Sequence, residues 1–398
     1  MKVVLAAYGS RGDTEPFAAL GRELRRRGHD VCMAVAPHMV GFVESAGLAA
    51  VPFGPQSLAS GRTVSGDDPA SAEAEKKEYL SRAMAEWGTT LTTLANGADV
   101  LVAGRAEQQL AGNVAEYYGI PDATLHFYPE SHLRQSGWVG DTMEEAEHAH
   151  RRALGLADVT GPVPRSLEIQ GYDALYFPGL AAEWADGDSW RPFVGALTLE
   201  LPTEADDDVL SWIAAGTPPI YFGFGSGVRL PYPAETFGLI SVACARLGER
   251  ALICSGASDF VDAPHSDQVK VVRAVNHSAV FPACRAVVHQ GGAGTTAAGM
   301  RAGIPTLILW HPINDQQIWA DAVTRLQVGS GRAFSGSNLG SLVADLRSIL
   351  DPQCITRARE VAVRMTTPAV SAASAADLLE DAGRLGAWAR RQHRVRRW

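Results

Sequence analysis

The chain opens on a repeated alternation of apolar runs and helix-like patterns. Residues 2–7 (KVVLAA) are apolar throughout, and a second apolar run follows at residues 30–37. Between them Phe17, Leu20 and Leu24 recur at the spacing of one helix face, so the pattern predicts a strand, a helix and a strand. Three further apolar runs continue the alternation, at residues 48–54, 98–104 and 122–129. Strands that are apolar along their whole length are typical of a parallel sheet with helices on both faces.

The same alternation restarts in the second half of the chain. Five apolar runs predict its strands, at residues 218–225, 249–256, 268–272, 285–289 and 306–310. An acidic, proline-containing stretch separates the two sets and places a domain boundary near residues 199–206. We therefore predict two Rossmann-like doubly wound α/β domains facing across a cleft, since such sheets bind ligands at the carboxyl ends of their strands. The predicted divisions are an N-terminal domain at residues 1–199, a second domain at residues 206–380 and a C-terminal helix at residues 381–398.

Length, charge and cysteine usage narrow the class of protein. A chain of 398 residues exceeds what one hydrophobic core usually serves, which agrees with two domains. The net charge of -9 argues against nucleic acid as the main partner, because polyanion binding needs an excess of Lys and Arg. Five scattered cysteines, never in CxxC spacing, argue against disulfides and structural zinc. The first apolar run is too short for a signal peptide or a membrane span, so we expect a cytoplasmic protein.

One basic cluster stands out, in the C-terminal tail. Its members are Arg390, Arg391, Arg394, Arg396 and Arg397. A solvated helix end and a peripheral contact with a membrane surface both account for it. The sequence does not indicate an oligomeric state.

Glycine-rich turns follow two strands of the second half. The first turn leads from the strand at residues 285–289 into a predicted helix, through His289, Gly291, Gly292, Gly294, Thr295 and Thr296. Free backbone N–H groups and the positive end of a helix favour an anion, and the two threonine hydroxyls can donate to phosphate oxygens. The second turn contains Gly225, Ser226 and Gly227. Two such turns in one domain indicate a diphosphate site; the alternative is that the glycines only make tight turns.

Other motifs fit less well. Residues 292–297 match the G-x-G-x-x-A pattern of a dinucleotide-binding domain, and Asp315 lies about 20 residues further on. However, the match comes late in its domain, and Asp315 belongs to the following helix. The sequence has no phosphate-binding loop with Gly-Lys-Ser/Thr and no GxSxG motif, while His148 and His150 lack the spacing of a zinc enzyme.

Three segments together resemble the inverting nucleotide-sugar glycosyltransferases of the GT-B fold. They are residues 9–16 (GSRGDTEP), residues 218–227 (PPIYFGFGSG) and residues 275–317, which contain HQGGAGTT and NDQQ. The chain is most similar to the actinobacterial family-1 branch that glycosylates glycopeptide antibiotics and mycobacterial glycolipids. The resemblance implies a hexosyltransferase that needs no metal or other cofactor. It implies as binding partners a UDP- or dTDP-hexose or -deoxyhexose and a small-molecule acceptor, a lipid-like or peptide natural product with a free hydroxyl.

The resemblance also assigns roles to residues. It implies Asp13 as the general base, and it implies that the last helix packs back on the N-terminal domain. Residues around the donor phosphates would be Ser10, Arg11, Gly225, Ser226, His289, Gly292, Gly294 and Thr295. The backbone of Val275 would pair with the nucleotide base, and Asp315 with Gln316 would bind hydroxyls of the donor sugar.

Several alternatives stay open on the sequence. Asp13 or Thr14 would serve equally well as the cap of a helix predicted to start near Pro16. Asp315 would likewise serve as a helix cap, and His126 is an alternative base. The segment after Tyr128 is shorter than in the mycobacterial relatives, which leaves the acceptor class open. Two other functions share this architecture: a sugar-nucleotide epimerase and a non-catalytic sugar-nucleotide-binding protein.

Overall fold

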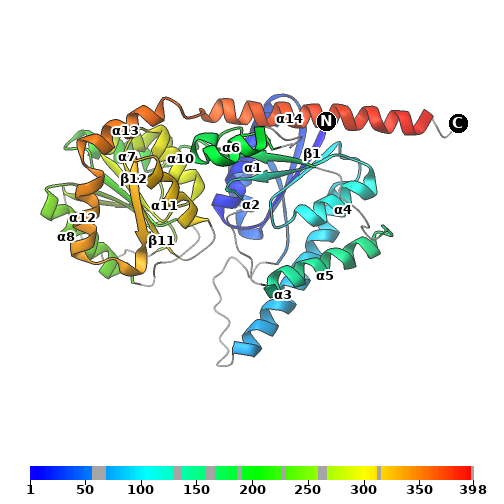
Figure 1. Cartoon of the computed structure of the whole chain (residues 1–398), viewed down its shortest axis with the longest axis horizontal. Coiled ribbons are helices and arrows are strands. Elements are labelled where there is room, and N and C mark those ends of the chain that lie inside the picture. Colours follow the sequence, from blue (N-terminus) through cyan, green and yellow to red (C-terminus); the bar gives the residue numbers. More distant parts are fainter. Residues whose placement is uncertain are drawn as a thin grey trace. The chain divides into compact units, whose positions relative to one another are not determined.

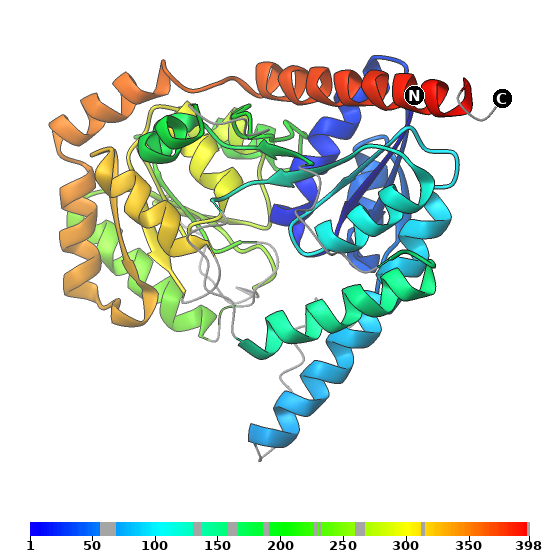
Figure 2. The same ribbon diagram turned by 45° about the vertical axis from the view of Figure 1, so that its right-hand side comes forward.

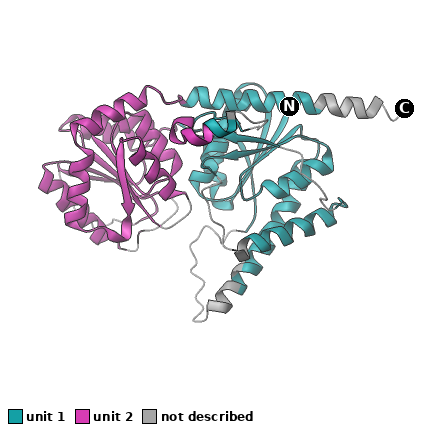
Figure 3. Cartoon of the chain, viewed as in Figure 1, with its two compact units in different colours: residues 1–171, 182–199, 368–398 teal, residues 172–181, 200–367 magenta. Residues whose placement is uncertain are grey.

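A computed structural model of the chain describes residues 1–55, 69–129, 137–157, 166–185, 191–225, 230, 232–258, 267–311 and 315–395. The chain divides into two compact units (Figure 3). Unit 1 comprises residues 1–171, 182–199 and 368–398, and unit 2 comprises residues 172–181 and 200–367. Within the described residues each unit holds one parallel sheet of six strands with helices on its faces, so the predicted α/β class with two doubly wound domains is confirmed.

Unit 1 is built on a sheet with the strand order β3-β2-β1-β4-β5-β6. Its strands are β1 (Lys2–Ala7), β2 (Asp30–Val35), β3 (Ala49–Pro52), β4 (Val100–Ala103), β5 (Asp122–His126) and β6 (Leu167–Gln170). Its helices are α1 (Arg11–Arg26), η1 (Pro37–Met39), α2 (Val40–Ser45), α3 (Pro69–Leu94), α4 (Gln108–Tyr118), α5 (Gly137–Ala153) and α14 (Pro368–Val395). Helix α6 (Pro178–Ala185) is shared between the two units.

Alternate residues of the unit 1 strands serve two different cores. Val4 and Ala6 of β1 pack with Met84 and Trp87 of α3 and with residues of α4. The opposite face receives α1, where Gly21 allows the helix to approach Leu5 closely. Helices α3 and α5 lie side by side, as Figures 1 and 2 both show. Met84 and Trp87 of α3 thus belong to the same core as β1, the strand that precedes the predicted site loop at residues 9–16.

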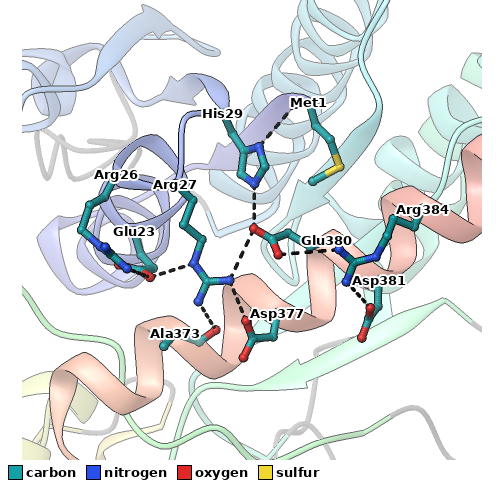
Figure 4. Close-up of polar contacts among 10 residues, drawn as sticks. All are labelled: Met1, Glu23, Arg26, Arg27, His29, Ala373, Asp377, Glu380, Asp381 and Arg384. Carbon is teal, nitrogen blue, oxygen red and sulfur yellow. Dashed lines mark hydrogen bonds and ion pairs between the residues drawn. The ribbon is translucent and has the colours of Figure 1, made fainter.

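Helix α14 closes unit 1 through charged contacts (Figure 4). The Arg27 guanidinium donates to Asp377 at 2.6 Å and to the carbonyl oxygen of Ala373 at 3.1 Å. The ring of His29 lies 2.9 Å from the Glu380 carboxylate. The predicted packing of the last helix on the N-terminal domain thus has a concrete form, but the contacts begin well before residue 381. This places residues 368–380 in unit 1 rather than in the second domain of the predicted division.

Unit 2 repeats the topology of unit 1. Its sheet order is β12-β11-β10-β7-β8-β9. Its strands are β7 (Ile220–Gly223), β8 (Ala251–Cys254), β9 (Val269–Val272), β10 (Ala286–His289), β11 (Thr306–Trp310) and β12 (Gly329–Ala333). Its helices are η4 (Ala174–Tyr176), α7 (Asp206–Ala214), α8 (Pro233–Leu247), α9 (His277–Val280), η5 (Phe281–Ala283), α10 (Ala293–Arg301), α11 (Gln316–Arg325), η6 (Phe334–Gly336), α12 (Leu339–Ile349) and α13 (Pro352–Ala362).

The unit 2 sheet also separates two cores. Helices α8 and α12 pack on one face, against residues such as Phe222 and Val288 (Figure 1). Tyr221, Leu252 and Val287 point to the other face and pack with α7, α9 and η5. Residues 172–181 also group with unit 2, because their aromatic side chains pack on Trp319 of α11. The predicted division had assigned these residues to the N-terminal domain.

In each sheet the strand order reverses at one point. In unit 1 this point lies between β1 and β4, and in unit 2 between β7 and β10. At this point the connections that follow the two neighbouring strands run to opposite faces of the sheet. This leaves a crevice at the carboxyl ends of the two strands. The topology therefore directs attention to the four loops that follow these strands. In the part of the chain that the structure describes, no helix is long and apolar enough to cross a membrane.

Candidate active site

The loop after β1 is shaped around a carboxylate. Gly9 has φ +150°, and a Cβ at this position would collide with the side chain of Asp13. Helix α1 begins at Arg11 with Ser10 as its N-cap residue, so the predicted start near Pro16 was wrong. Pro16 lies inside the helix, where it removes one backbone donor. The earlier start places Asp13 in the first helical turn.

Asp13 is held by Ser10. The backbone N–H of Ser10 donates to Asp13 Oδ2 at 2.7 Å, and Ser10 Oγ donates to the same oxygen at 3.0 Å. Burial raises the pKa of Asp13, and the hydrogen bonds from Ser10 oppose that rise. Asp13 is thus not the cap residue that one alternative proposed: it is the third residue of α1, and its carboxylate bonds back to the N-cap residue, Ser10. Its raised pKa suits a general base.

Ser10 and Arg11 are engaged within unit 1. The Arg11 Nε donates to Glu15 Oε2 at 2.7 Å, and its guanidinium lies 5.0 Å from the centre of the Phe42 ring. Ser10 uses both its N–H and its hydroxyl on Asp13. Their role around the donor phosphates stays a prediction.

A second carboxyl group, Glu107, lies at the same reversal point of the unit 1 sheet. It follows β4, is 1% exposed and accepts a hydrogen bond from the Tyr8 N–H at 3.1 Å. Burial raises its pKa to about 8, and the negative charge of Asp13 adds to the rise. No motif in the sequence indicated Glu107 as a site residue. Its only signal was an acidic residue three positions beyond Gly104, where a strand ends at the reversal point.

The loop after β10 presents an imidazole instead. His289 is 1% exposed, and its Nδ1 accepts a hydrogen bond from the Gly291 N–H at 3.0 Å. An accepting Nδ1 carries no proton, so the proton of the neutral ring is on Nε2. Burial lowers the pKa of His289 to about 3, with a further contribution from His277. Within the described residues, Nε2 is buried and has no hydrogen-bond partner. His289 therefore offers one N–H donor from a ring that stays neutral.

Gly291 joins this loop to the next helix. Its φ is +102°, and an added Cβ would lie 2.8 Å from the Gln316 carbonyl oxygen and 3.0 Å from a methyl group of Ile308. Only glycine fits, because both the conformation and the space exclude a side chain. The predicted phosphate loop and the predicted sugar-binding pair are thus neighbours in unit 2.

Helix α10 begins without a side-chain cap. Its N-cap residue is Gly292, and Gly294 and Thr295 lie in its first turn. The first backbone N–H groups of a helix have no partner within the helix, so this end can bind an anion. Thr296 was expected to donate to phosphate, but its hydroxyl donates to the Gly292 carbonyl at 2.9 Å. That expectation was wrong for Thr296, while Thr295 stays half-buried at the helix start.

The second glycine turn touches the first. The side-chain amide of Gln290 lies directly against the Cα of Gly225, so the loops after β7 and β10 meet. Ser226 and Gly227 lie outside the described residues.

Val275 lies in a fixed stretch of backbone. Its side chain is buried with Tyr221 and Phe281. The next residue, Asn276, donates its N–H to Asp206 at 2.8 Å and accepts from the Ser278 N–H through its side chain. These bonds hold the peptide groups next to the predicted base contact.

Asp315 and Gln316 stand at the start of α11. Gln316 is 7% exposed, and its Oε1 accepts from the His311 N–H at 2.8 Å, so its side-chain donor is the amide NH₂. Asp315 is the N-cap residue, but its side chain makes no cap hydrogen bond. Instead, Asp315 Oδ2 accepts from Trp319 Nε1 at 2.8 Å. Asp315 therefore occupies the cap position that the alternative gave it, but its side chain does not make the cap hydrogen bond.

Other candidate chemistry is less well supported. His126, the alternative base, is buried in β5. No group of three or more His, Cys, Asp or Glu residues among the described positions could hold a metal ion.

Two family models match the chain. A model of the erythromycin biosynthesis protein CIII-like C-terminal domain matches residues 255–383, and a model of the glycosyltransferase family 28 N-terminal domain matches residues 3–106. The first match includes β10, α10 and the start of α11. The second includes β1 and the loop that carries Asp13.

Individual proteins match over nearly the whole length. An uncharacterized glycosyltransferase of Mycobacterium tuberculosis is 53% identical over 418 residues, which cover 96% of this chain and 99% of the relative. The vancomycin aglycone glucosyltransferase of Amycolatopsis orientalis is 30% identical over 412 residues, covering 96% and 98%. The solved structure of the glycosyltransferase VinC in complex with dTDP aligns with a TM-score of 0.69 at 18% identity, covering 96% of this chain and all of VinC.

Proposed function

Since this chain belongs to the glycosyltransferases of the GT-B fold, we propose that it moves a hexose or deoxyhexose from a UDP- or dTDP-sugar to an acceptor hydroxyl. The acceptor would be a lipid-like or peptide natural product, and the transfer would invert the anomeric carbon without a metal. The observation that carries the proposal is the buried His289, a neutral ring with one N–H donor that stands three residues before Gly292, the N-cap residue of the uncapped α10. The proposal takes the enzyme to act in the cytoplasm.

The donor half of the reaction would use unit 2. The N–H groups at the start of α10 and the Nε2–H of His289 would bind the diphosphate and stabilise the negative charge that grows on it as the sugar leaves. Because the positive end of a helix and a neutral donor supply this stabilisation, a metal ion is not required. Asp315 and the amide NH₂ of Gln316 would hold the sugar hydroxyls.

The acceptor half would use Asp13. Its carboxylate would accept the proton of the acceptor hydroxyl as that oxygen attacks the anomeric carbon from the side opposite the diphosphate. Both hydrogen bonds from Ser10 end on Oδ2, so Oδ1 would meet the hydroxyl. A general base of this kind contributes about 10²- to 10⁴-fold to the rate.

The names of two similar proteins support the proposed substrate classes. The relative from Amycolatopsis orientalis is named for the transfer of a glucosyl group to the vancomycin aglycone, and the VinC structure contains dTDP. We therefore favour sugar nucleotides of UDP or dTDP and a natural-product hydroxyl over the epimerase and the non-catalytic binding protein.

The test is a transfer assay with the purified full-length chain. UDP- and dTDP-hexoses would be combined with phenolic, lipid and glycopeptide-aglycone acceptors, with mass spectrometry of products and NMR of the new anomeric centre. We expect acceptor-dependent release of nucleoside diphosphate and an inverted product. In Asp13→Asn the kcat should fall about 10²- to 10⁴-fold while nucleoside diphosphate binding is kept. Asp30→Asn, an exposed aspartate of the same unit, is the matched control.

Other outcomes would contradict the proposal. Turnover of the sugar nucleotide without acceptor would indicate an epimerase. Tight diphosphate binding without turnover across the panel would indicate a binding protein. Full transfer by Asp13→Asn would move the base elsewhere, and His126→Gln would be tested next.

A further inference from the structure

Asp315 departs from the usual behaviour of an aspartate at the start of a helix. Such a residue normally turns back to accept a hydrogen bond from the backbone N–H of its own first turn. In α11 it makes no cap bond, and Asp315 Oδ2 accepts from Trp319 Nε1, one turn later, at 2.8 Å. The four-residue spacing puts both side chains on the same face of the helix. The indole N–H is therefore a donor to this carboxylate from the same helix, in place of the usual cap bond.

Trp319 itself is firmly held. It is 1% exposed, and three aromatic rings meet it edge-on at centroid distances of 6.2 Å for Tyr172, 5.1 Å for Tyr176 and 5.7 Å for Phe177. Edge-to-face ring pairs at these distances are attractive beyond the area that they bury. The indole thus has a fixed position against which the carboxylate is held.

The segment that supplies these rings is anchored to unit 2 at two points. The Asp173 carboxylate accepts from the Thr366 N–H at 2.7 Å, and the Arg325 guanidinium of α11 donates to the Tyr176 carbonyl oxygen. Arg325 also lies 5.7 Å from the centre of the Phe177 ring. Residues 172–177 are therefore fixed to the same helix that carries Asp315 and Trp319.

We propose that Trp319 is a positioning residue for the donor sugar: its indole N–H holds the Asp315 carboxylate away from the helix backbone, in the orientation that binds sugar hydroxyls. The inference rests on the proposed function, which gives Asp315 its sugar. An indole nitrogen only donates, so it orients the carboxylate and leaves it an acceptor. The aromatic residues 172–177 are part of the device, because they fix the indole.

The experiment separates the sugar from the nucleotide. Kd values for UDP, dTDP and their hexose derivatives would be measured by calorimetry, with kcat/KM for donor, in the wild type, Trp319→Phe, Asp315→Ala and the double variant. Trp319→Phe should lower kcat/KM for the donor by about 10-fold, because one hydrogen bond to a charged group is lost. It should also weaken the binding of the sugar nucleotides by about 10-fold relative to the binding of UDP or dTDP without a sugar. The Kd of the free diphosphate should stay within 2-fold. The double variant should match Asp315→Ala.

Two further variants control for packing. Tyr176→Phe removes a hydroxyl that is buried without a hydrogen-bond partner among the described residues, and it keeps the ring beside Trp319. It should behave as the wild type. Phe177→Leu loosens the packing of the indole and keeps its N–H, so a smaller loss of the same sugar-specific kind is expected. It carries the test if Trp319→Phe does not fold.

Three results for Trp319→Phe would overturn the inference. They are an equal loss of diphosphate and sugar-nucleotide binding in Trp319→Phe, no loss of either, and an effect that adds to that of Asp315→Ala. If Asp315→Ala itself changes nothing, the sugar role of Asp315 fails, and this inference with it. If the wild type transfers no sugar, the proposed function fails, while the binding measurements still decide the role of Trp319.

Discussion

The reversal points of the two sheets share one topology and carry opposite chemistry. In unit 1 the loops after β1 and β4 bring two carboxyl groups, Asp13 and Glu107, and the pKa of each is raised. In unit 2 the loops after β7 and β10 bring glycines and His289, and the sequence has no acidic residue at positions 220–234 or 286–314. Both sheets therefore have the reversal of strand order that favours ligand binding, but only the loops at the reversal point of unit 2 are suited to an anion.

The helix starts explain how this difference arises. In unit 1, Asp13 places its own carboxylate on the N–H of the N-cap residue, Ser10. In unit 2, the N-cap residue of α10 is Gly292, which has no side chain to do so. A helix end already neutralised by its own carboxylate has little attraction left for a phosphate, whereas an uncapped end keeps it. One side chain thus distinguishes a helix start that is occupied by a carboxylate from one whose N–H groups have no side-chain cap.

The largest expected effect comes from removing the N–H donor of unit 2. An asparagine at position 289 places an amide oxygen near the site of Nδ1, so it can still accept from Gly291, but it has no donor at the site of Nε2. We expect His289→Asn to weaken binding of UDP or dTDP by about 10- to 150-fold, the worth of a hydrogen bond to a charged group. Calorimetry between pH 5 and 9 measures it, and the wild-type contribution of His289 should be constant there because its pKa is about 3.

A matched variant sharpens that result. Glutamine at position 289 places its amide NH₂ near the site of Nε2, so His289→Gln should keep most of the diphosphate affinity. Wild-type affinity in His289→Asn would show that unit 2 does not bind its anion through this ring.

The second prediction concerns the buried acid of unit 1. A pKa raised to about 8 means that folded Glu107 keeps a proton that the unfolded chain loses above its ordinary pKa of 4.5. Its contribution to stability is therefore complete below pH 4.5 and is lost as the pH rises toward 8. Glu107→Gln, which does not titrate, should gain Tm relative to the wild type by roughly 2 to 6 °C between pH 5 and pH 8.5.

Thermal unfolding at a series of pH values provides the measurement. Glu78→Gln, an exposed position on α3, is the control and should follow the wild type at every pH. If the Tm of Glu107→Gln and that of the wild type change in parallel with pH, Glu107 is ionised in the folded protein. Asp13 would then be the one remaining acid in the comparison between the two units.

The smallest effect tests the coupling between Ser10 and Asp13. The Ser10 hydroxyl lowers the pKa of Asp13, so its removal in Ser10→Ala should raise that pKa. A base works when deprotonated, so the acid limb of the kcat/KM profile should move to higher pH by roughly 0.4 to 1 unit. Ser10→Thr keeps the hydroxyl and should keep the profile. An unchanged profile with weaker donor binding would instead place Ser10 on the diphosphate.

The predictability of the fold follows the apolar content of each strand. Interior strands such as β1 and β10 are buried on both faces and read as apolar runs, so their positions were predicted. The edge strands β6 and β12 were missed. Strand β12 has the sequence GSGRA and is half-buried, so no local preference indicates a strand. It forms because its neighbour β11 offers free backbone groups, a tertiary effect that outweighs propensity.

The site divides in a similar way. His289 and Gly292 stand in a motif with a mechanism, so their place at one helix start was predictable. The burial of Glu107 depends on the path of the chain between β4 and α4. The residues next to Glu107 in the sequence do not predict that path. The bond between Trp319 and Asp315 was within reach, because a spacing of four on a helix predicts a side-chain pair.

The pairing of Arg27 and His29 with α14 also affects the order in which the two units are completed during synthesis. The partners Asp377 and Glu380 are synthesised 350 and 351 residues after them. At ribosomal speeds of about 5 to 20 residues per second, the first half of unit 1 waits roughly 20 to 70 s for its last helix. Unit 2 has meanwhile received every residue it needs. Unit 1 is therefore begun before unit 2 and completed after it.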